Sequence, residues 1–532
     1  MPRTQHFDAL VRLLQQADAA DRTSGAALPS SGRGTIGRRQ FLAGTARGAA
    51  AAAMAAGLPV PSWGARATVP DVGIVGGGLA GMACADTLRQ RGVVAPVYEA
   101  SSRAGGRCWS LRQTFPGQVV ERGGELIDNL HKTMLSYAQR FGLAREDVNK
   151  RPGEVFYVFG GVRYPEAAVV DQFREFVQTM RSDLRRLSGE PTALNFTPED
   201  AQLDRVSLAE YLDGQNARGE AAGPVARAAI VAAYEAEYGL AAAEQSALNF
   251  LLFIHADRRS KFTPFGVFSD ERWHIPDGND RIVQGLAGSL PGQIRFGRRL
   301  VRVRPASDGR IELTFETAGG TERRVHEAVV LSLPFSVLRE VDLHASLALP
   351  DAKRHAIESL GYGTNAKMMV GFESRPWLDV DGTGASYSDF EHHQTTWETN
   401  AANATASRGV LTDYSSGARG ASLTLAEVQA ETALFLTDLD DVYPGALAAA
   451  RRSAAGKYTV HLEPWPSNPL SRGSYTCYRP GQFTTIAGHE GTSVGNVHFA
   501  GEHTNSFYEW QGFMEGAALS GIDVAERILK GA

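Results

Sequence analysis

The chain has 532 residues, and its 43% hydrophobic and 21% charged residues form an ordinary globular composition that excludes intrinsic disorder for most of its length. A formal net charge of −5 gives no reason to expect a nucleic-acid partner, because nucleic-acid binding needs a basic face. Three cysteines, Cys84, Cys108 and Cys477, are too few for a disulfide framework and do not have metal-ligand spacing. The length allows about three domains, or two large interleaved ones.

Residues 1–67 have the layout of a twin-arginine export signal. The pair Arg38-Arg39 precedes an Ala-rich run, and Ala65-Arg66-Ala67 forms a small-x-small cleavage pattern. The Ala-rich run is short and weakly apolar, whereas a stable membrane span needs about 20 strongly apolar residues. We therefore predict a periplasmic or secreted protein whose partners include the twin-arginine export machinery. A chance arginine pair before an Ala-rich helix is the alternative.

Residues 71–91 read as a strand, a glycine turn and a helix. Gly76, Gly78 and Gly81 form the pattern G-x-G-x-x-G, in which the first glycine permits a tight turn, the second lets the backbone approach a pyrophosphate and the third lets the helix pack closely. A second strand ends at Glu99, where a ribose-binding carboxylate is expected. The pattern predicts a dinucleotide site at Gly76, Gly78, Leu79, Ala80, Gly81 and Glu99. A glycine turn without a ligand is the alternative.

Two further segments favour FAD over a nicotinamide cofactor. Residues 102–107 place Arg103 and Arg107 around a glycine pair, so that the arginines can close over phosphates while the backbone stays near the cofactor. Residues 121–125 offer another close backbone approach. We predict that Arg107, Gly123, Gly124 and Glu125 contribute to FAD binding.

The sequence resembles the flavin-containing amine oxidase family, which includes monoamine, polyamine and L-amino acid oxidases. The similar segments are residues 75–81, 99–107, 122–125, 361–377 and 497–521, so the resemblance covers essentially the mature chain. It implies an α/β fold with two domains, a Rossmann-like FAD-binding domain and an interleaved α+β substrate domain. The implied FAD-binding segments are 69–147, 275–350 and 462–532, and the implied substrate segments are 148–274 and 351–461.

The resemblance also implies roles for residues near the C-terminus. The acid that matches Glu502, after Gly501, bonds the ribityl or phosphate region of FAD, and the backbone at Met514 contacts the flavin ring. Val301 matches a strand position whose backbone meets adenine. The alternatives are a surface acid for Glu502, a buried methionine for Met514 and an ordinary buried strand around Val301.

Four residues are implied as catalytic. Lys367 matches the family lysine that holds a water against the flavin, although a lone lysine at a strand end is more often solvated. Tyr475 and Phe513 match the two walls of an aromatic cage, and Trp510 lies close by in sequence; the alternative is core packing. Monoamine oxidases carry a flavin-bonding cysteine where this chain has Ser474, so we predict that FAD is bound non-covalently.

The residues around the implied substrate site favour an amine over an amino acid. The arginine with which L-amino acid oxidases bind the substrate carboxylate is replaced by Leu126, and Arg122 lies on the other side of the glycines. Asp128 and Glu237 resemble the acids with which polyamine oxidases bind a second ammonium group. Helix capping by Asp128 and a solvated position for Glu237 are the alternatives. His131, His274, His392 and His393 form no metal pattern and are taken as packing or surface residues.

We therefore predict a FAD-dependent oxidase that converts a primary or secondary amine to an imine, and then to an aldehyde plus ammonia or a shorter amine, while oxygen is reduced to hydrogen peroxide. Three alternatives stay open. One is an L-amino acid oxidase with its carboxylate-binding residue elsewhere. Another is an amine dehydrogenase with a different electron acceptor. The last is a non-catalytic flavin-binding protein.

Overall fold

The computed structural model describes Gln16 and residues 70–150, 153–255, 271–399, 407–505 and 510–531. Residues 70–532 belong to one compact unit. The export signal predicted at residues 1–67 lies outside the described residues except for Gln16. Among the helices that are described, none has the length and apolar character required to cross a membrane.

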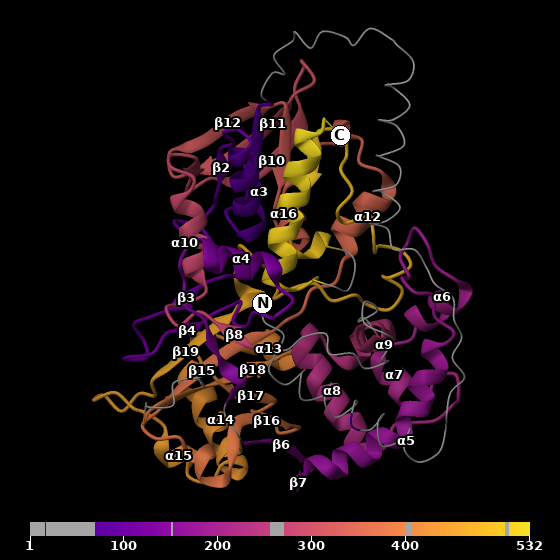
Figure 1. The fold of residues 1–532 in the computed structure, drawn as a ribbon, viewed down its shortest axis with the longest axis vertical. Helices are drawn as coiled ribbons and strands as arrows, with labels where there is room; N and C mark the ends of the chain where they lie inside the picture. Colours follow the sequence, from indigo (N-terminus) through magenta and orange to yellow (C-terminus); the bar gives the residue numbers. More distant parts are fainter. Residues whose placement is uncertain are drawn as a thin grey trace, which may run out of the picture. The chain divides into compact units, whose positions relative to one another are not determined.

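A five-stranded parallel sheet brings the two ends of the described chain together. Its order is β20 (Val497–Phe499), β13 (Ala328–Leu331), β1 (Val72–Val75), β2 (Val97–Tyr98) and β9 (Ile294–Arg295). Strand β1 is apolar and buried along its whole length, as expected for a parallel strand covered on both faces. Helices α3 (Leu79–Gln90) and α16 (Met514–Leu529) lie side by side next to this sheet (Figure 1).

Smaller elements surround the parallel sheet. A four-stranded sheet has the order β12 (Gly320–His326), β11 (Ile311–Thr317), β10 (Arg299–Pro305) and β14 (Asp342–Leu343). Helices α4 (Lys132–Arg140) and α10 (Asp280–Gly288) pack against α3 or α16. Two strand pairs complete this part, β3 (Ser110–Leu111) with β4 (Val120–Glu121) and β5 (Glu146–Asp147) with β8 (Trp273–His274).

A seven-stranded mixed sheet forms the second part of the unit. Its order is β19 (Val460–Pro464), β15 (Ala366–Phe372), β18 (Gly409–Ser415), β17 (Thr395–Glu398), β16 (Gly382–Ser388), β6 (Glu154–Phe159) and β7 (Val162–Tyr164). All pairs are antiparallel except β16 with β6. Strands β15 and β18 are buried throughout, so side chains on both of their faces are enclosed.

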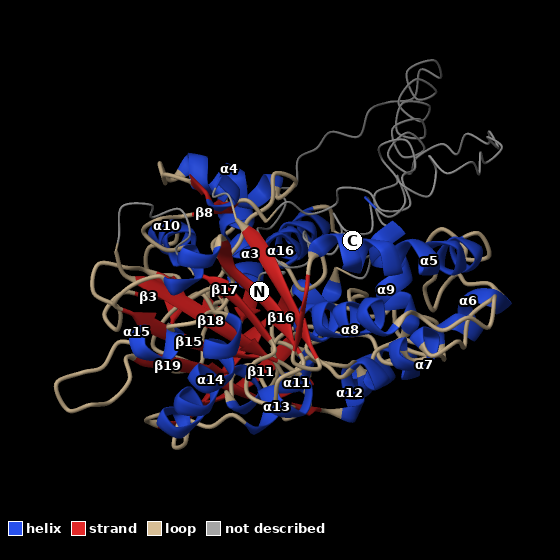
Figure 2. Ribbon diagram, turned by 90° about the horizontal axis from the view of Figure 1, so that it is seen from below, coloured by secondary structure: helices blue, strands red, loops and turns tan. Residues whose placement is uncertain are grey.

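A group of helices packs beside this sheet, with α8 in contact with β6, β16 and β17 (Figure 2). The group comprises α5 (Glu166–Leu184), α6 (Pro198–Asp204), α7 (Leu208–Leu212), α8 (Pro224–Tyr238) and α9 (Ala247–His255). Reciprocal capping boxes begin α6 and α7, with Thr197 and Ser207 as the N-caps. The remaining helices are α11 (Phe335–Leu338), α12 (Asp351–Ser359), α13 (Gly417–Ser422), α14 (Val428–Val442) and α15 (Ala446–Ala449).

The chain passes repeatedly between the two large sheets. The strands of the parallel sheet lie in the segments predicted for the FAD-binding domain, and most strands of the seven-stranded sheet lie in the segments predicted for the substrate domain. Strand β19 crosses the predicted boundary at residues 461 and 462. The exact division into two domains stays a prediction.

Candidate active site

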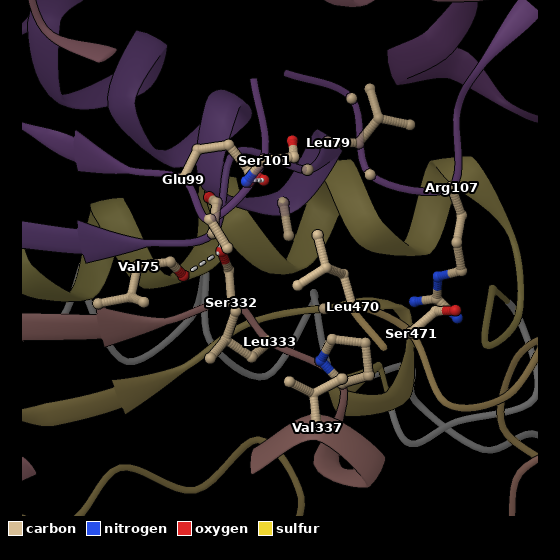
Figure 3. A pocket seen from close by; sticks show the side chains of 18 of the residues that line it. Val75, Leu79, Glu99, Ser101, Arg107, Ser332, Leu333, Val337, Leu470 and Ser471 are labelled. Carbon is tan, nitrogen blue, oxygen red and sulfur yellow. Dashed lines mark hydrogen bonds between the residues drawn. The ribbon is translucent and has the colours of Figure 1, made fainter. Parts of the chain in front are cut away.

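A cavity of about 700 Å³ opens at the carboxyl ends of the parallel strands, where ligands bind in open α/β sheets. Its lining follows directly after β1, β2, β13 and β20. Figure 3 shows side chains at the ends of β1, β2 and β13 around the cavity, together with Leu470 and Ser471 from a loop far along the chain. The predicted site residues in its lining are Gly76, Gly78, Leu79, Ala80, Glu99, Arg107, Gly501, Glu502, Phe513 and Met514.

The three glycines of the turn have different surroundings. Gly76 has a φ of +103°, which L side chains rarely adopt. A Cβ on Gly81 would lie 2.0 Å from the Gly76 carbonyl oxygen, so Gly81 allows α3 to meet the turn. Gly78 lines the cavity, and a Cβ there would meet no protein atom within 4 Å. Gly78 therefore presents its backbone, without a side chain, to the cavity, so that a pyrophosphate can approach it closely.

Glu99 orders the loop beside this turn. Its Oε2 accepts a hydrogen bond from the Gly77 amide at 2.7 Å, and its Oε1 accepts one from the Ser101 amide at 2.8 Å. The carboxylate is thus held at the edge of the cavity, where it can also accept hydrogen bonds from a ribose.

Arg107 and Glu502 join the N-terminal and C-terminal motifs. Arg107 Nη1 lies 3.0 Å from Glu502 Oε1 and donates to the Ser474 carbonyl oxygen at 2.5 Å. Glu502 Oε2 accepts from Thr476 and from the Gly512 amide. Burial alone would raise the pKa of Glu502, but the Arg107 guanidinium lowers it, and the resulting pKa lies below the ordinary value. Glu502 is therefore a charged carboxylate that ties the two ends of the site together.

Aromatic and sulfur-containing side chains form another part of the cavity lining. Phe513 and Met514 lie at the start of α16, and a Cβ on Gly124 would lie 2.7 Å from the Met514 sulfur. Trp465 also lines the cavity and is fully buried, and its indole N–H donates to the Arg122 carbonyl oxygen. Sequence reasoning missed Trp465, although it follows β19 directly.

A second missed aromatic residue is Trp109. It lines the cavity between two guanidinium groups, with the Arg103 and Arg122 carbons 3.7 and 3.1 Å from the centre of an indole ring. Arg122 also forms an ion pair with Glu463. The Arg122 guanidinium therefore contacts Trp109 and Glu463. At the position where the resemblance implies an arginine in L-amino acid oxidases, this chain has the buried Leu126.

Lys367 is completely buried at the second position of β15. Its Nζ lies 2.5 Å from Glu125 Oε2, 2.8 Å from the Glu121 carbonyl oxygen and 3.4 Å from the Gly123 carbonyl oxygen. The alternative of a solvated lysine at a strand end is therefore excluded. Glu125, predicted to contact the cofactor, is instead placed between Lys367 and the Trp397 indole N–H, which donates to Oε1 at 3.0 Å.

Tyr475 is buried beside the seven-stranded sheet that contains Lys367. Its hydroxyl donates to the Ala236 carbonyl oxygen at 3.0 Å and lies 3.2 Å from the Tyr414 hydroxyl. Tyr414 makes an edge contact with Trp397, with ring centres 5.2 Å apart. A Cβ on Gly512 would lie 3.8 Å from the Tyr475 ring, so Tyr475 adjoins the segment that carries Phe513.

Phe513 and Trp510 share a cluster with His131. The His131 ring is 4.9 Å from Phe513 and 5.0 Å from Trp510, both in edge geometry. His131 Nε2 lies 3.2 Å from Asp128 Oδ2, and Asp128 accepts from the Glu271 amide. His131 is thus a packing residue, as one of the two expectations had it, and its partners come from a segment far along the chain.

The two predicted substrate acids are both buried. Asp128 is 1% exposed and Glu237 is 2% exposed, so Glu237 is not a solvated helix acid. Helix α4 begins after His131 rather than after Asp128, so Asp128 is not its N-cap. Burial raises the pKa of Tyr414, and the charges of Glu237, Glu125 and Glu271 raise it further. The carboxylates of these three residues therefore lie near one buried tyrosine.

The other predicted residues lie outside the cavity lining. Val301 sits at an irregularity of β10, between Leu300 and Arg302, and Leu300 rather than Val301 lines the cavity. The remaining predicted residues that do not line it are Gly81, Gly123, Gly124, Glu125, Asp128, Glu237, Lys367, Tyr475 and Trp510.

The observed residues fit FAD. A positive-φ turn, an open glycine backbone at the start of α3 and the Glu99 carboxylate suit the dinucleotide, and the aromatic side chains of Trp109, Trp465 and Phe513 line the same cavity. The described residues include all three cysteines, and of these Cys108 lines the cavity. Burial raises the pKa of Cys84, Cys108 and Cys477, so all three stay thiols at neutral pH. Ser474 donates its hydroxyl to Asn365.

Comparisons with known proteins extend over nearly all of the described chain. The family model described as flavin containing amine oxidoreductase matches residues 79–529. The chain is 25% identical to an L-amino-acid oxidase of Siganus canaliculatus over 485 residues, which are 87% of this chain and 86% of that protein. It is also 25% identical to amine oxidase [flavin-containing] B of Sus scrofa over 474 residues, 86% of each.

A solved structure shares the fold. A putrescine oxidase with putrescine bound superimposes with a TM-score of 0.71 at 21% identity, covering 87% of this chain and 99% of that one. This similarity confirms the predicted α/β fold, in which a Rossmann-like part is interleaved with a second part.

Proposed function

This chain belongs to the flavin containing amine oxidoreductase family and uses FAD, and from that premise we propose that it is an exported oxidase that converts a primary or secondary amine to an imine with oxygen as the electron acceptor. The Arg107–Glu502 pair carries the proposal, because it joins the first and last cofactor motifs at one cavity that is also lined by aromatic side chains. When bound, FAD supplies the capacity to accept two electrons from the amine.

The chain's own residues bind, orient and desolvate the substrate. Phe513 and Trp465 line the cavity, and Tyr475 packs beside Trp465, so these rings enclose an amine and exclude water. Lys367 Nζ is fixed by the main-chain carbonyl groups of Glu121 and Gly123. Positioning by such fixed groups contributes to the rate because the reactants are already aligned.

The charges around the aromatic side chains favour a cationic substrate. Asp128, Glu237 and Glu271 are buried carboxylates near Tyr414 and His131, and they attract an ammonium group. The five arginines of the cavity lining contact protein groups. Arg107 pairs with Glu502, and Arg103 donates to the Ala104 and Gly106 carbonyl oxygens. Arg298, Arg299 and Arg472 pair with Glu322, Glu316 and Glu340. We propose a substrate with an amine at one end and, at the other, an apolar or cationic group rather than a carboxylate.

Anaerobic mixing of the yellow protein with monoamines, diamines and L-amino acids tests the substrate class. The proposal expects loss of flavin absorbance with amines and little change with L-amino acids. Reduction by L-amino acids but not by the amines they give on decarboxylation would replace the proposal with an L-amino acid oxidase. Adding oxygen to the reduced protein then separates an oxidase, which regains its colour and releases hydrogen peroxide, from a dehydrogenase.

The export proposal rests on residues 1–67. Replacing Arg38 and Arg39 by lysines tests it, because the twin-arginine machinery reads the arginine pair as an address. The proposal expects flavoprotein in the periplasm or medium for the natural sequence and in the cytoplasm for the variant. An unchanged distribution between the fractions would contradict it.

A further inference from the structure

The buried ammonium group of Lys367 is satisfied by three acceptors, which equals the number of N–H bonds that it can donate. Two of them are carbonyl oxygens of residues 121 and 123, and the third is the Glu125 carboxylate. The Glu125 and Lys367 side chains are 3% and 0% exposed. The ammonium charge is therefore balanced by a neighbour of opposite charge rather than by solvent.

Hydrogen bonds from Asn279 fix the main chain around Glu125. The Asn279 side-chain amide donates to the Gly124 carbonyl oxygen at 3.1 Å and to the Glu125 carbonyl oxygen at 2.6 Å. The Asn279 backbone amide donates to Glu121 Oε1 at 2.8 Å. These bonds fix the loop whose carbonyl groups receive Lys367.

The Glu125 carboxylate is fixed from its other side by Trp397. The indole N–H donates to Oε1, while Oε2 faces Lys367, so each carboxylate oxygen has a separate partner. Lys367 Nζ also lies 5.4 Å from the centre of a Trp397 ring. Trp397 contacts Tyr414, and Tyr414 reaches Tyr475 through the two hydroxyl groups. One network thus connects the lysine with the predicted aromatic cage.

We propose that Glu125 is a positioning residue for the oxidation reaction, which holds the Lys367 ammonium group in one orientation and balances its charge, and that it acts through Lys367 rather than by contacting FAD. This inference rests on the proposed function. Glu125 does not line the cavity, and its two oxygens are occupied by Lys367 and Trp397. Without the carboxylate, the ammonium would be a buried charge lacking its counter-ion, which proteins tolerate poorly.

Four variants test the proposal, Glu125→Gln, Lys367→Met, the double variant and Trp397→Phe. We expect Glu125→Gln to slow anaerobic flavin reduction about 100-fold, as misplacement of a positioned group can do. Trp397→Phe removes the second hydrogen bond and is expected to slow reduction less. In the Lys367→Met background, Glu125→Gln should change the rate less than about threefold, because residues that act as a unit are not additive.

The midpoint potential of the bound FAD gives a readout that needs no amine. Glu125→Gln removes a negative charge and leaves the Lys367 charge uncompensated, so the potential should rise. Lys367→Met should lower it, and the double variant should return towards the natural protein. If no amine reduces the natural protein, the proposed function fails while these potentials still decide the role of Glu125.

Glu398→Gln is the matched control. Glu398 lies on the same sheet, accepts from the Trp377 indole N–H at 2.9 Å and pairs with Arg375 at 2.7 Å, so it repeats the glutamate–tryptophan–cation arrangement away from Lys367. It should leave the potential and the rate unchanged. Three results would overturn the proposal: equal effects of the control, multiplicative effects of the two single variants, or loss of FAD from Glu125→Gln but not from Lys367→Met.

Discussion

His274 gives a stability prediction whose size follows from the structure. The ring is buried between two carboxylates, with Nδ1 2.7 Å from Glu146 and Nε2 3.1 Å from Glu121. Burial alone would lower the pKa of His274, but the hydrogen bonds and charges of Glu121 and Glu146 outweigh burial and raise it to about 9, from an ordinary value of 6.5. In the folded protein, the imidazolium therefore persists at pH values where the unfolded chain has lost its proton.

The sign of the pH dependence follows from this difference. Between the unfolded and folded pKa values, the native state binds one more proton than the unfolded state, so the free energy of unfolding falls as pH rises. The slope is about 1.4 kcal/mol per pH unit, and the shift corresponds to about 3 kcal/mol in total. The full contribution is present below the unfolded pKa and is lost as pH rises through about 9.

The contribution of His274 is measured by urea unfolding of the natural protein and of His274→Gln. Both proteins are followed across this pH window with FAD in excess. The difference in free energy of unfolding between the two proteins should shrink by about 3 kcal/mol from about pH 6 to about pH 9.5. A difference between natural protein and His274→Gln that stays constant over the window would refute the reasoning.

Three further predictions concern the cofactor and the lysine. Lys367→Met should keep the bound FAD but slow its reduction by amine strongly in stopped-flow measurements; an unchanged rate would remove Lys367 from the mechanism. Gly78→Ala should leave the unfolding midpoint nearly unchanged but weaken FAD binding at least tenfold in a flavin fluorescence titration, because the added Cβ meets no protein atom yet faces the cavity. Gly288→Ala on α10, where an added Cβ also meets no protein atom, should leave both the unfolding midpoint and FAD binding nearly unchanged. Acid precipitation should leave the yellow colour in the supernatant, since Ser474 and the buried Cys108 thiol do not suit a covalent bond; a yellow pellet would contradict this.

Local motifs made the cofactor half of this protein predictable. A turn such as Gly76 to Gly81 depends on backbone angles and on close contact within a few residues, so its requirements are written in adjacent positions of the sequence. The motif around Glu502, directly after β20, is likewise made of adjacent positions of the sequence. The family resemblance added the pairing of these two motifs in one site, and the Arg107–Glu502 contact shows how the chain achieves it.

The sequence by itself thus indicated the Rossmann-like turn, because that turn depends on short-range backbone geometry, and its resemblance to known motifs indicated the family and the FAD cofactor. Only the tertiary structure decided the surroundings of the reacting end. The pairing of Glu125 with Lys367 joins residues 242 positions apart, and the cluster of His131 with Phe513 joins residues still farther apart. Such contacts depend on how the two sheets and their loops pack, so no local spacing records them.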